Sequence, residues 1–115
     1  MPEFIFSYRS AKSYDAVADP DGLAAWSAFL NDIIAPNVMD PGWPVFEPAT
    51  VLGEAGQSTQ LGGFSIVTAD DLETALSMAE RCPTIKRGGG VEVAVLAALP
   101  PEHPAEQIRS RLSKA

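Results

Sequence analysis

The order in which strand-like and helix-like apolar patterns follow one another constrains this fold more than any other feature. Four segments rich in branched and aromatic residues are typical of β-strands, namely residues 3–8, 45–52, 60–67 and 91–96. Apolar residues recur at three- and four-residue steps after Pro20 and again after Asp71, which predicts two amphipathic helices. The predicted order along the chain is therefore β-α-β-β-α-β.

This order is that of the ferredoxin-like split βαβ arrangement, an α+β fold. It predicts an antiparallel four-stranded sheet with two helices on one face. The first and last predicted strands carry apolar residues on both sides. An apolar sheet face left open would be an aggregation hazard, so we expect a homodimer through that face. Val93 in the last strand is expected to lie in the interface, and Val93→Asp is expected to break the dimer.

Local signals place the ends of these elements. Asp19 followed by Pro20 predicts a helix N-cap with proline at the first helical position, and Pro36 ends that helix. Pro48 lies inside the predicted strand 45–52 and removes a ladder donor, which favours an edge strand or a bulge. The pair Gly62–Gly63 predicts a bulge or the close approach of another group, either a ligand or a packed helix.

The length of 115 residues suits one domain. We expect residues 1–100 to form it and residues 101–115 to be a C-terminal tail. That tail can form a short helix through Ile108 and Leu112.

The single histidine and single cysteine exclude a His/Cys zinc cage and a disulfide, and we expect no metal or cofactor. The formal charge of −7 argues against binding to nucleic acid. No apolar run reaches the roughly 20 residues that span a bilayer. The N-terminal residues have no basic leader or apolar core of a signal peptide, so a cytoplasmic protein without membrane contact is expected.

Aromatic residues suggest a small-molecule pocket between the sheet and the first helix. Trp43 is the most informative of them, because it lies in a loop rich in proline and glycine, although Trp26 can equally be plain core. The predicted ligand-binding residues are Tyr8, Arg9, Asp40, Trp43, Gln60 and Ser65. His103, between prolines, is either a general base or a solvated tail residue, and Cys82 is expected to be a buried, inert thiol.

Four segments in the second half of the chain form a distinctive series. They are residues 61–67, 70–76, 79–83 and 89–93, which read Leu-Gly-Gly-Phe-Ser-Ile-Val, a segment opening Asp-Asp-Leu, Ala-Glu-Arg-Cys-Pro and Gly-Gly-Val-Glu-Val. In their order and spacing these segments resemble the YCII-related domain family, in particular its DGPF-type branch. The resemblance implies a dimeric α+β barrel built from ferredoxin-like subunits. The Asp-Gly-Pro-Phe motif that names the branch is absent before Leu61, where residues 54–60 read Glu-Ala-Gly-Gln-Ser-Thr-Gln.

The resemblance leaves two functions open. Enzymatic roles proposed for the family depend on a His–Asp pair in a cleft, and this chain has no histidine before His103. We therefore expect a dimeric small-molecule-binding protein that lacks the pair. The alternative is a cofactor-free enzyme, oxygenase-like or isomerase-like, with a His-independent cleft.

Overall fold

The computed structural model describes residues 1–55 and 58–113. Its strands are β1 (Glu3–Ala11), β2 (Val38–Asp40), β3 (Thr59–Thr68) and β4 (Gly90–Val95). Its α-helices are α1 (Pro20–Phe29), α2 (Leu72–Ala79) and α3 (Pro104–Ser113). Single-turn helices join them, namely η1 (Ala16–Ala18), η2 (Leu30–Ile34), η3 (Ala35–Asn37) and η4 (Pro83–Arg87).

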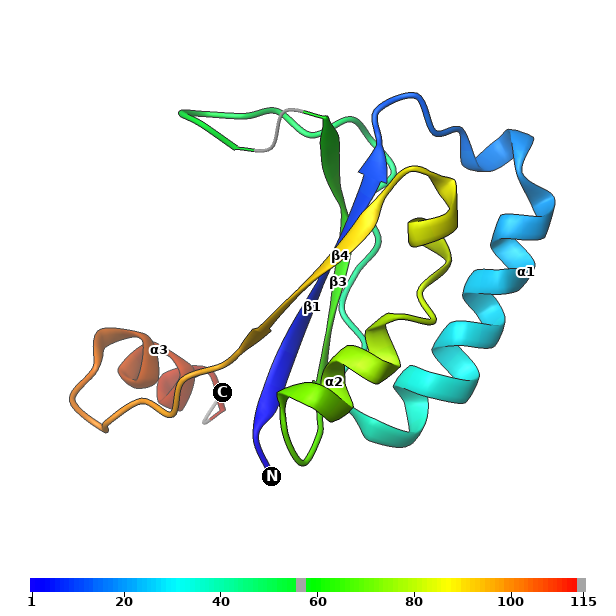
Figure 1. Ribbon diagram of the computed structural model, residues 1–115. Helices are drawn as coiled ribbons and strands as arrows, with labels where there is room; N and C mark the ends of the chain where they lie inside the picture. The colour runs from blue at the N-terminus through cyan, green and yellow to red at the C-terminus, as the bar shows by residue number, and fades with distance from the viewer. Residues whose placement is uncertain (56–57, 114–115) are drawn as a thin grey trace.

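The four strands form one antiparallel sheet in the order β2-β3-β1-β4. On central strand β1, Phe6 lies opposite Ser65 of β3 and Val93 of β4. Figure 1 shows α1 and α2 against one face of this sheet and α3 on the opposite side, at the end of the chain. The predicted α+β class and antiparallel four-stranded sheet are confirmed, and the architecture is consistent with a ferredoxin-like fold.

The second strand is not where the sequence predicted it. Residues 45–52 are not a strand, and β2 is instead the three-residue segment Val38–Asp40, which pairs with β3. Beyond it, contact with β3 is limited to a bridge between Pro44 and Gly63 and a hydrogen bond from Val45 N–H to Gly62 O. Pro44 and Pro48 have no N–H to donate, so this segment cannot continue a regular ladder.

Helix α1 begins as the sequence predicted. The Asp19 carboxylate accepts a hydrogen bond from Gly22 N–H at 3.0 Å, and Pro20 occupies the first helical position. After Phe29 the chain continues as the π-turn η2 and the 3₁₀-turn η3, which contains Pro36. The proline therefore ends the helical path, but the regular α-helix already stops at Phe29.

The core lies between the sheet and the two helices α1 and α2. At the start of α2, Asp71 caps the helix by accepting from Thr74 N–H at 2.7 Å. Side chains that alternate along β1 and β3 meet residues of the helices in one buried cluster, made of Phe4, Phe6, Tyr8, Phe29, Ile34, Val67, Ala69, Ala75, Ala79 and Cys82. The core thus uses only one face of the sheet.

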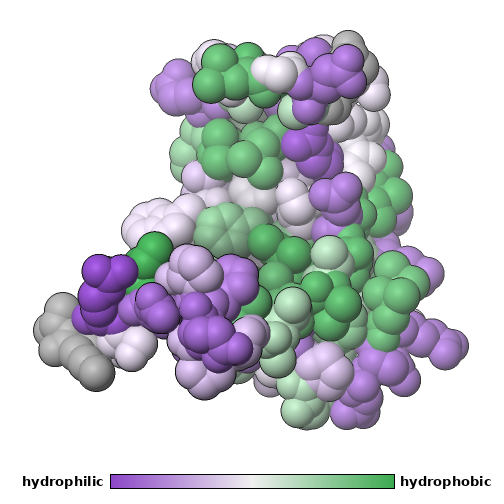
Figure 2. All heavy atoms as spheres, turned by 90° about the vertical axis from the view of Figure 1, so that its left-hand side faces the viewer, coloured by the Kyte–Doolittle hydropathy of each residue, from purple (hydrophilic) through white to green (hydrophobic). Residues whose placement is uncertain are grey.

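The opposite face, here called the open face, carries a central apolar row. Ile5 pairs with Ile66 on one side and Ala94 on the other, and all three alternate with residues of the helix-covered face. Figure 2 looks onto this side and shows apolar residues gathered over the sheet. Val93 packs against the core instead, so the expectation that it lies on the open face is wrong.

Across the described residues, no helix combines the length and the apolar character that crossing a membrane requires.

Candidate functional site

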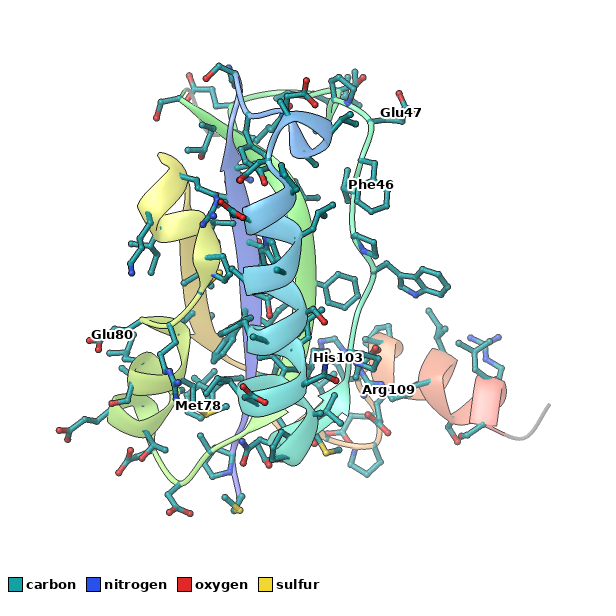
Figure 3. The ribbon with its side chains drawn as sticks, turned by 90° about the vertical axis from the view of Figure 1, so that its right-hand side faces the viewer. Phe46, Glu47, Met78, Glu80, His103 and Arg109 are labelled. Atoms are coloured by element: carbon teal, nitrogen blue, oxygen red, sulfur yellow. The ribbon has the colours of Figure 1, made fainter. Side chains whose placement is uncertain are left out.

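A cavity of about 350 Å³ lies on the helix-covered face of the sheet. Strands β1 and β3 form its floor, α1 forms one wall, and residues 41–46 form the other. Figure 3 shows this last segment running alongside α1, with Phe46 on it. Four of the six predicted ligand-binding residues line the cavity, namely Tyr8, Trp43, Gln60 and Ser65.

The wall formed by α1 is aromatic and aliphatic. The ring of Trp26 meets the ring of Tyr8 edge to face, with centroids 4.8 Å apart, and it meets Phe29 in the same way at 5.6 Å. Leu23 of α1 and Leu30, the first residue of η2, continue the apolar repeat of this helical segment, yet they are 56% and 39% exposed and line the cavity. The apolar stripe of α1 therefore serves both the core and the cavity.

Two glycines allow the outer wall to lie directly on β3. Gly42 has φ +76°, and a Cβ there would meet the carbonyl oxygen of Phe64. Gly63 has φ +146°, and a Cβ there would lie 2.9 Å from the carbonyl oxygen of Trp43. The close approach expected at Gly62–Gly63 is thus made by the backbone of residues 43–44.

The polar floor of the cavity is a short hydrogen-bond chain. The hydroxyl of Tyr8 donates to Ser65 Oγ at 2.9 Å, and Ser65 Oγ donates to the carbonyl oxygen of Pro41 at 2.9 Å. Burial raises the pKa of Tyr8 to about 12, against the opposite effect of its hydrogen bond with Ser65. Tyr8 therefore keeps its proton at neutral pH and cannot serve as a ready base.

A β-bulge brings Gln60 to the same face as this chain. Tyr8 lies opposite Gly63, but the next residue, Arg9, lies opposite Leu61, so Gly62 is the extra residue. The bulge reverses the side to which successive residues of β3 point. As a result, Gln60 lies opposite Ser10 and faces the cavity. Ser10 and Tyr14 also line the cavity, although no sequence pattern marked them as site residues.

Arg9 and Asp40, the other two predicted site residues, do not line the cavity. Arg9 follows Tyr8 on β1 and points to the other face, where its guanidinium donates to the side-chain and main-chain oxygens of Thr59. Asp40 accepts from Gly42 N–H at 2.8 Å and so stabilises the turn that follows β2. Both carboxylate and guanidinium therefore have structural partners outside the cavity.

His103 and Cys82 lie apart from the cavity. The Nδ1 atom of His103 accepts a hydrogen bond from Ala105 N–H at 3.1 Å at the start of α3, and Figure 3 shows this histidine near that helix. Cys82 is 2% exposed, and its sulfur lies 3.2 Å from Thr84 Oγ1. Burial raises the pKa of its thiol, which fits the expected inert core cysteine.

None of the described residues that line the cavity carries a charge. The lining residue Tyr14 connects the cavity to an ion pair: its hydroxyl donates to Asp19, and Asp19 forms a salt bridge with Arg87. Within residues 1–55 and 58–113, no group of three or more His, Cys, Asp or Glu side chains converges as metal ligands do. The cavity can therefore offer aromatic contacts and neutral hydrogen bonds.

The fold and the cavity define a small α+β domain with a neutral, aromatic-lined pocket under its helices. The sequence profile of the YCII-related domain matches residues 5–98, which is most of the chain. The chain belongs to the YCII-related domain family.

Among solved structures, the chain is similar to 5-chloro-2-hydroxyhydroquinone dehydrochlorinase from Burkholderia phenoliruptrix, determined in complex with 2,5-dihydroxybenzoquinone. The two share 22% sequence identity with a TM-score of 0.54, over 84% of this chain and 93% of the other. At this identity the likeness shows a shared fold. A comparison with curated proteins gave no match.

Proposed function

We propose that this YCII-related domain binds a small organic molecule in the cavity between β3, β1 and α1. The cavity itself carries the proposal: a volume of about 350 Å³ lies within the range of small-molecule pockets. Its walls are mostly apolar, and its few polar groups converge from Tyr8, Gln60 and Ser65. That combination is typical of a site that binds a ligand and orients it.

The rim of the cavity gives a second argument. Trp43 is 76% exposed and Phe46 is 84% exposed, although large aromatic side chains seldom project so far into water. Both aromatic residues lie on the segment 41–46. Gly42 in this segment and Gly63 in β3 both have a positive φ, which favours glycine, and they let the segment lie against the strand. A ligand seated against this segment would remove apolar surface from water, which stabilises a complex.

The test is a cavity-filling substitution with a matched control. We expect Leu23→Trp to fill the mouth of the cavity, whereas Leu72→Trp places the same side chain at a half-exposed site on α2, away from it. Isothermal titration with neutral, cationic and anionic one-ring compounds should show at least one that binds wild type and Leu72→Trp alike. Its affinity for Leu23→Trp should fall roughly tenfold or more, since a filled pocket loses the contacts of the ligand. Failure of every compound to bind, or equal binding to all three proteins, would contradict the proposal.

A second candidate function is cofactor-free catalysis in the same cavity. It is favoured by the structural neighbour, a dehydrochlorinase determined with a dihydroxybenzoquinone, which shares the fold. Against it, the phenol of Tyr8 holds its proton, and His103 lies at the start of α3 rather than in the cavity. Incubation with 5-chloro-2-hydroxyhydroquinone decides this point, because chloride release above that of a Leu23→Trp control would favour the enzyme.

We also propose that the protein is a homodimer, paired through the open face as a dimeric α+β barrel. The apolar row of Ile5, Ile66 and Ala94 supports this, since exposed apolar patches mark interaction surfaces. Membership in the DGPF-type branch and a cytoplasmic location are proposals of the same kind. The proposal of branch membership rests on the sequence Gly-Gly-Val-Glu-Val at residues 89–93, where β4 begins. The proposal of a cytoplasmic location rests on the free, buried thiol of Cys82.

A further inference from the structure

We infer that the cavity selects an uncharged aromatic ring that carries a hydroxyl or N–H donor, which it presents to the phenolic oxygen of Tyr8. This inference rests on the proposed ligand-binding function and adds the chemical class of the ligand. Three properties of the cavity lead to it: the absence of charge among its described lining residues, its aromatic walls, and the direction of the hydrogen-bond chain on its floor.

Charge decides the first part of the class. A carboxylate or an ammonium group that entered the cavity would lose water and meet no opposite charge among the described lining residues. Moving an ionised group out of water into such a place is unfavourable unless an opposite charge pairs with it. Asp19, which accepts the hydroxyl proton of the lining residue Tyr14, is already paired with Arg87. The cavity therefore favours a neutral compound over a carboxylate.

The walls decide the second part. Trp26, Trp43, Tyr8 and Phe46 are aromatic, and rings prefer offset or edge-to-face contact with one another. The Tyr8–Trp26 pair already has this geometry, with an interplanar angle of 83°. A flat ring of one or two cycles fits within a volume of about 350 Å³ and can make these contacts.

The direction of the floor hydrogen bonds decides the third part. The chain ends on the carbonyl oxygen of Pro41, which can only accept, so Ser65 must donate to it. Tyr8 then has to donate its own proton to Ser65. A phenolic oxygen has one proton and two lone pairs, so toward the cavity Tyr8 can only accept. The ligand group that matches Tyr8 is therefore an O–H or N–H donor.

Four probes of similar size test this class: phenol and aniline carry a donor, anisole keeps the oxygen without a donor, and benzoate is charged. Titration of the wild-type protein should show phenol and aniline binding roughly fivefold more tightly than anisole, which is the effect of one neutral hydrogen bond. Benzoate should bind at least tenfold more weakly than phenol. Leu23→Trp should weaken all binding, which places the probes in the cavity.

Two variants identify the acceptor. Tyr8→Phe removes the phenolic oxygen and keeps the ring, so phenol should lose its advantage over anisole while anisole binds as before. Tyr14→Phe removes the other tyrosine hydroxyl of the cavity, whose proton goes to Asp19. Loss of the advantage in Tyr14→Phe but not in Tyr8→Phe would overturn the assignment to Tyr8.

The outcomes separate the class of ligand from the existence of the site. If anisole or benzoate binds as tightly as phenol, and Leu23→Trp weakens that binding, the proposed site stands and the donor class is wrong. If none of the four probes binds, the donor class is overturned, and the wider panel of charged and neutral compounds decides whether the site itself stands.

Discussion

At the scale of single residues, Gly42 determines where the outer wall of the cavity lies. Its φ of +76° favours glycine, and a Cβ would collide with the backbone carbonyl of Phe64. We expect Gly42→Ala to lower the free energy of unfolding by about 2 kcal/mol or more, since the substitution combines strain with a clash. Urea denaturation followed by tryptophan fluorescence measures this change.

Gly53→Ala is the matched control for that substitution. Gly53 has a similar φ of +71°, but no described residue lies within 4 Å of its added Cβ. Gly53→Ala should lower the free energy of unfolding by only about 1 kcal/mol, which is the cost of holding an alanine at a positive φ. Equal losses in the two variants would show that the wall does not depend on the contact between residue 42 and β3.

Asp19 makes stability depend on pH. Its hydrogen bond with Arg87 is the main cause that lowers its carboxyl pKa below the ordinary 3.8, and bonds from Tyr14 and Gly22 add to the effect. The lowered pKa means that the stabilisation is present above pH 3.8 and is lost as the pH falls through the lower folded value.

Asp19→Asn keeps a capping side chain and removes the charge. Wild type should therefore be more stable than Asp19→Asn at pH 7, and the difference should shrink below pH 3.8. Urea titrations at pH 7, 4 and 2.5 measure it, and a difference that does not change with pH would contradict the role of the ion pair.

Which site residues the sequence could predict follows from their chemistry. Trp43 stood out because a large aromatic residue in a Pro/Gly loop has no place in a helix or strand pattern. Arg9 and Asp40 were chosen for polarity alone, and the structure uses them for Thr59 and for the turn at Gly42. Ser10 continues the alternation of Phe4, Phe6 and Tyr8, but β1 extends to Ala11, beyond the predicted strand 3–8.

At the scale of elements, the helices and three of the four strands follow from their patterns, and β2 does not. A three-residue strand has no alternation to detect, and β2 pairs only because the turns on either side bring it to β3. Residues 45–52 were predicted to be the strand because they include branched residues. The proline in this segment has no N–H to donate to a ladder, and the structure has no strand there.

Helix α3 is expected to be dispensable for the fold of a subunit. None of its described residues is buried, and Ile108 and Leu112 are 51% and 70% exposed. The free energy of unfolding of a chain that ends at Pro100 should differ from that of the full chain by no more than about 0.5 kcal/mol, because a helix without buried residues adds little stability. Chemical denaturation at low protein concentration measures this.

A chain that ends at Gly89 and so lacks β4 provides the contrast. It removes Val91 and Val93, which pack against the core, and should not fold. A large loss of stability in the chain that ends at Pro100 would contradict the division into a domain of residues 1–100 and a C-terminal tail. Of that tail, residues 114–115 lie outside the described structure.

At the scale of the whole molecule, the sheet has one face covered by helices and one left open. The order of elements predicted this layering, but it could not decide which side of β4 faces the helices, because both sides carry apolar residues. In the structure Val93 packs against the core, so its side of β4 faces the helices. The open face therefore carries Ile5, Ile66 and Ala94.

The proposed dimer has a direct test on this row. Wild type should elute with a mass of about twice 12.2 kDa in size exclusion with light scattering. Ile66→Asp should give monomers, because each subunit would bury a carboxylate in an apolar interface. This should weaken association roughly a hundredfold or more. Ile85→Asp changes a 46% exposed isoleucine of η4 and should remain dimeric. A monomeric wild type at micromolar concentration would contradict the dimer.

The central claim is that the cavity of this YCII-related domain binds a neutral aromatic ligand that carries a hydrogen-bond donor. The most direct measurement is a ¹H–¹⁵N NMR titration of the protein with phenol. The account predicts saturable shifts at the amides of Gln60, Gly62 and Gly63 and at the indole of Trp43, all of which line the cavity. Saturable shifts confined to the open face around Ile5 and Ile66, or no saturable shifts at all, would contradict it.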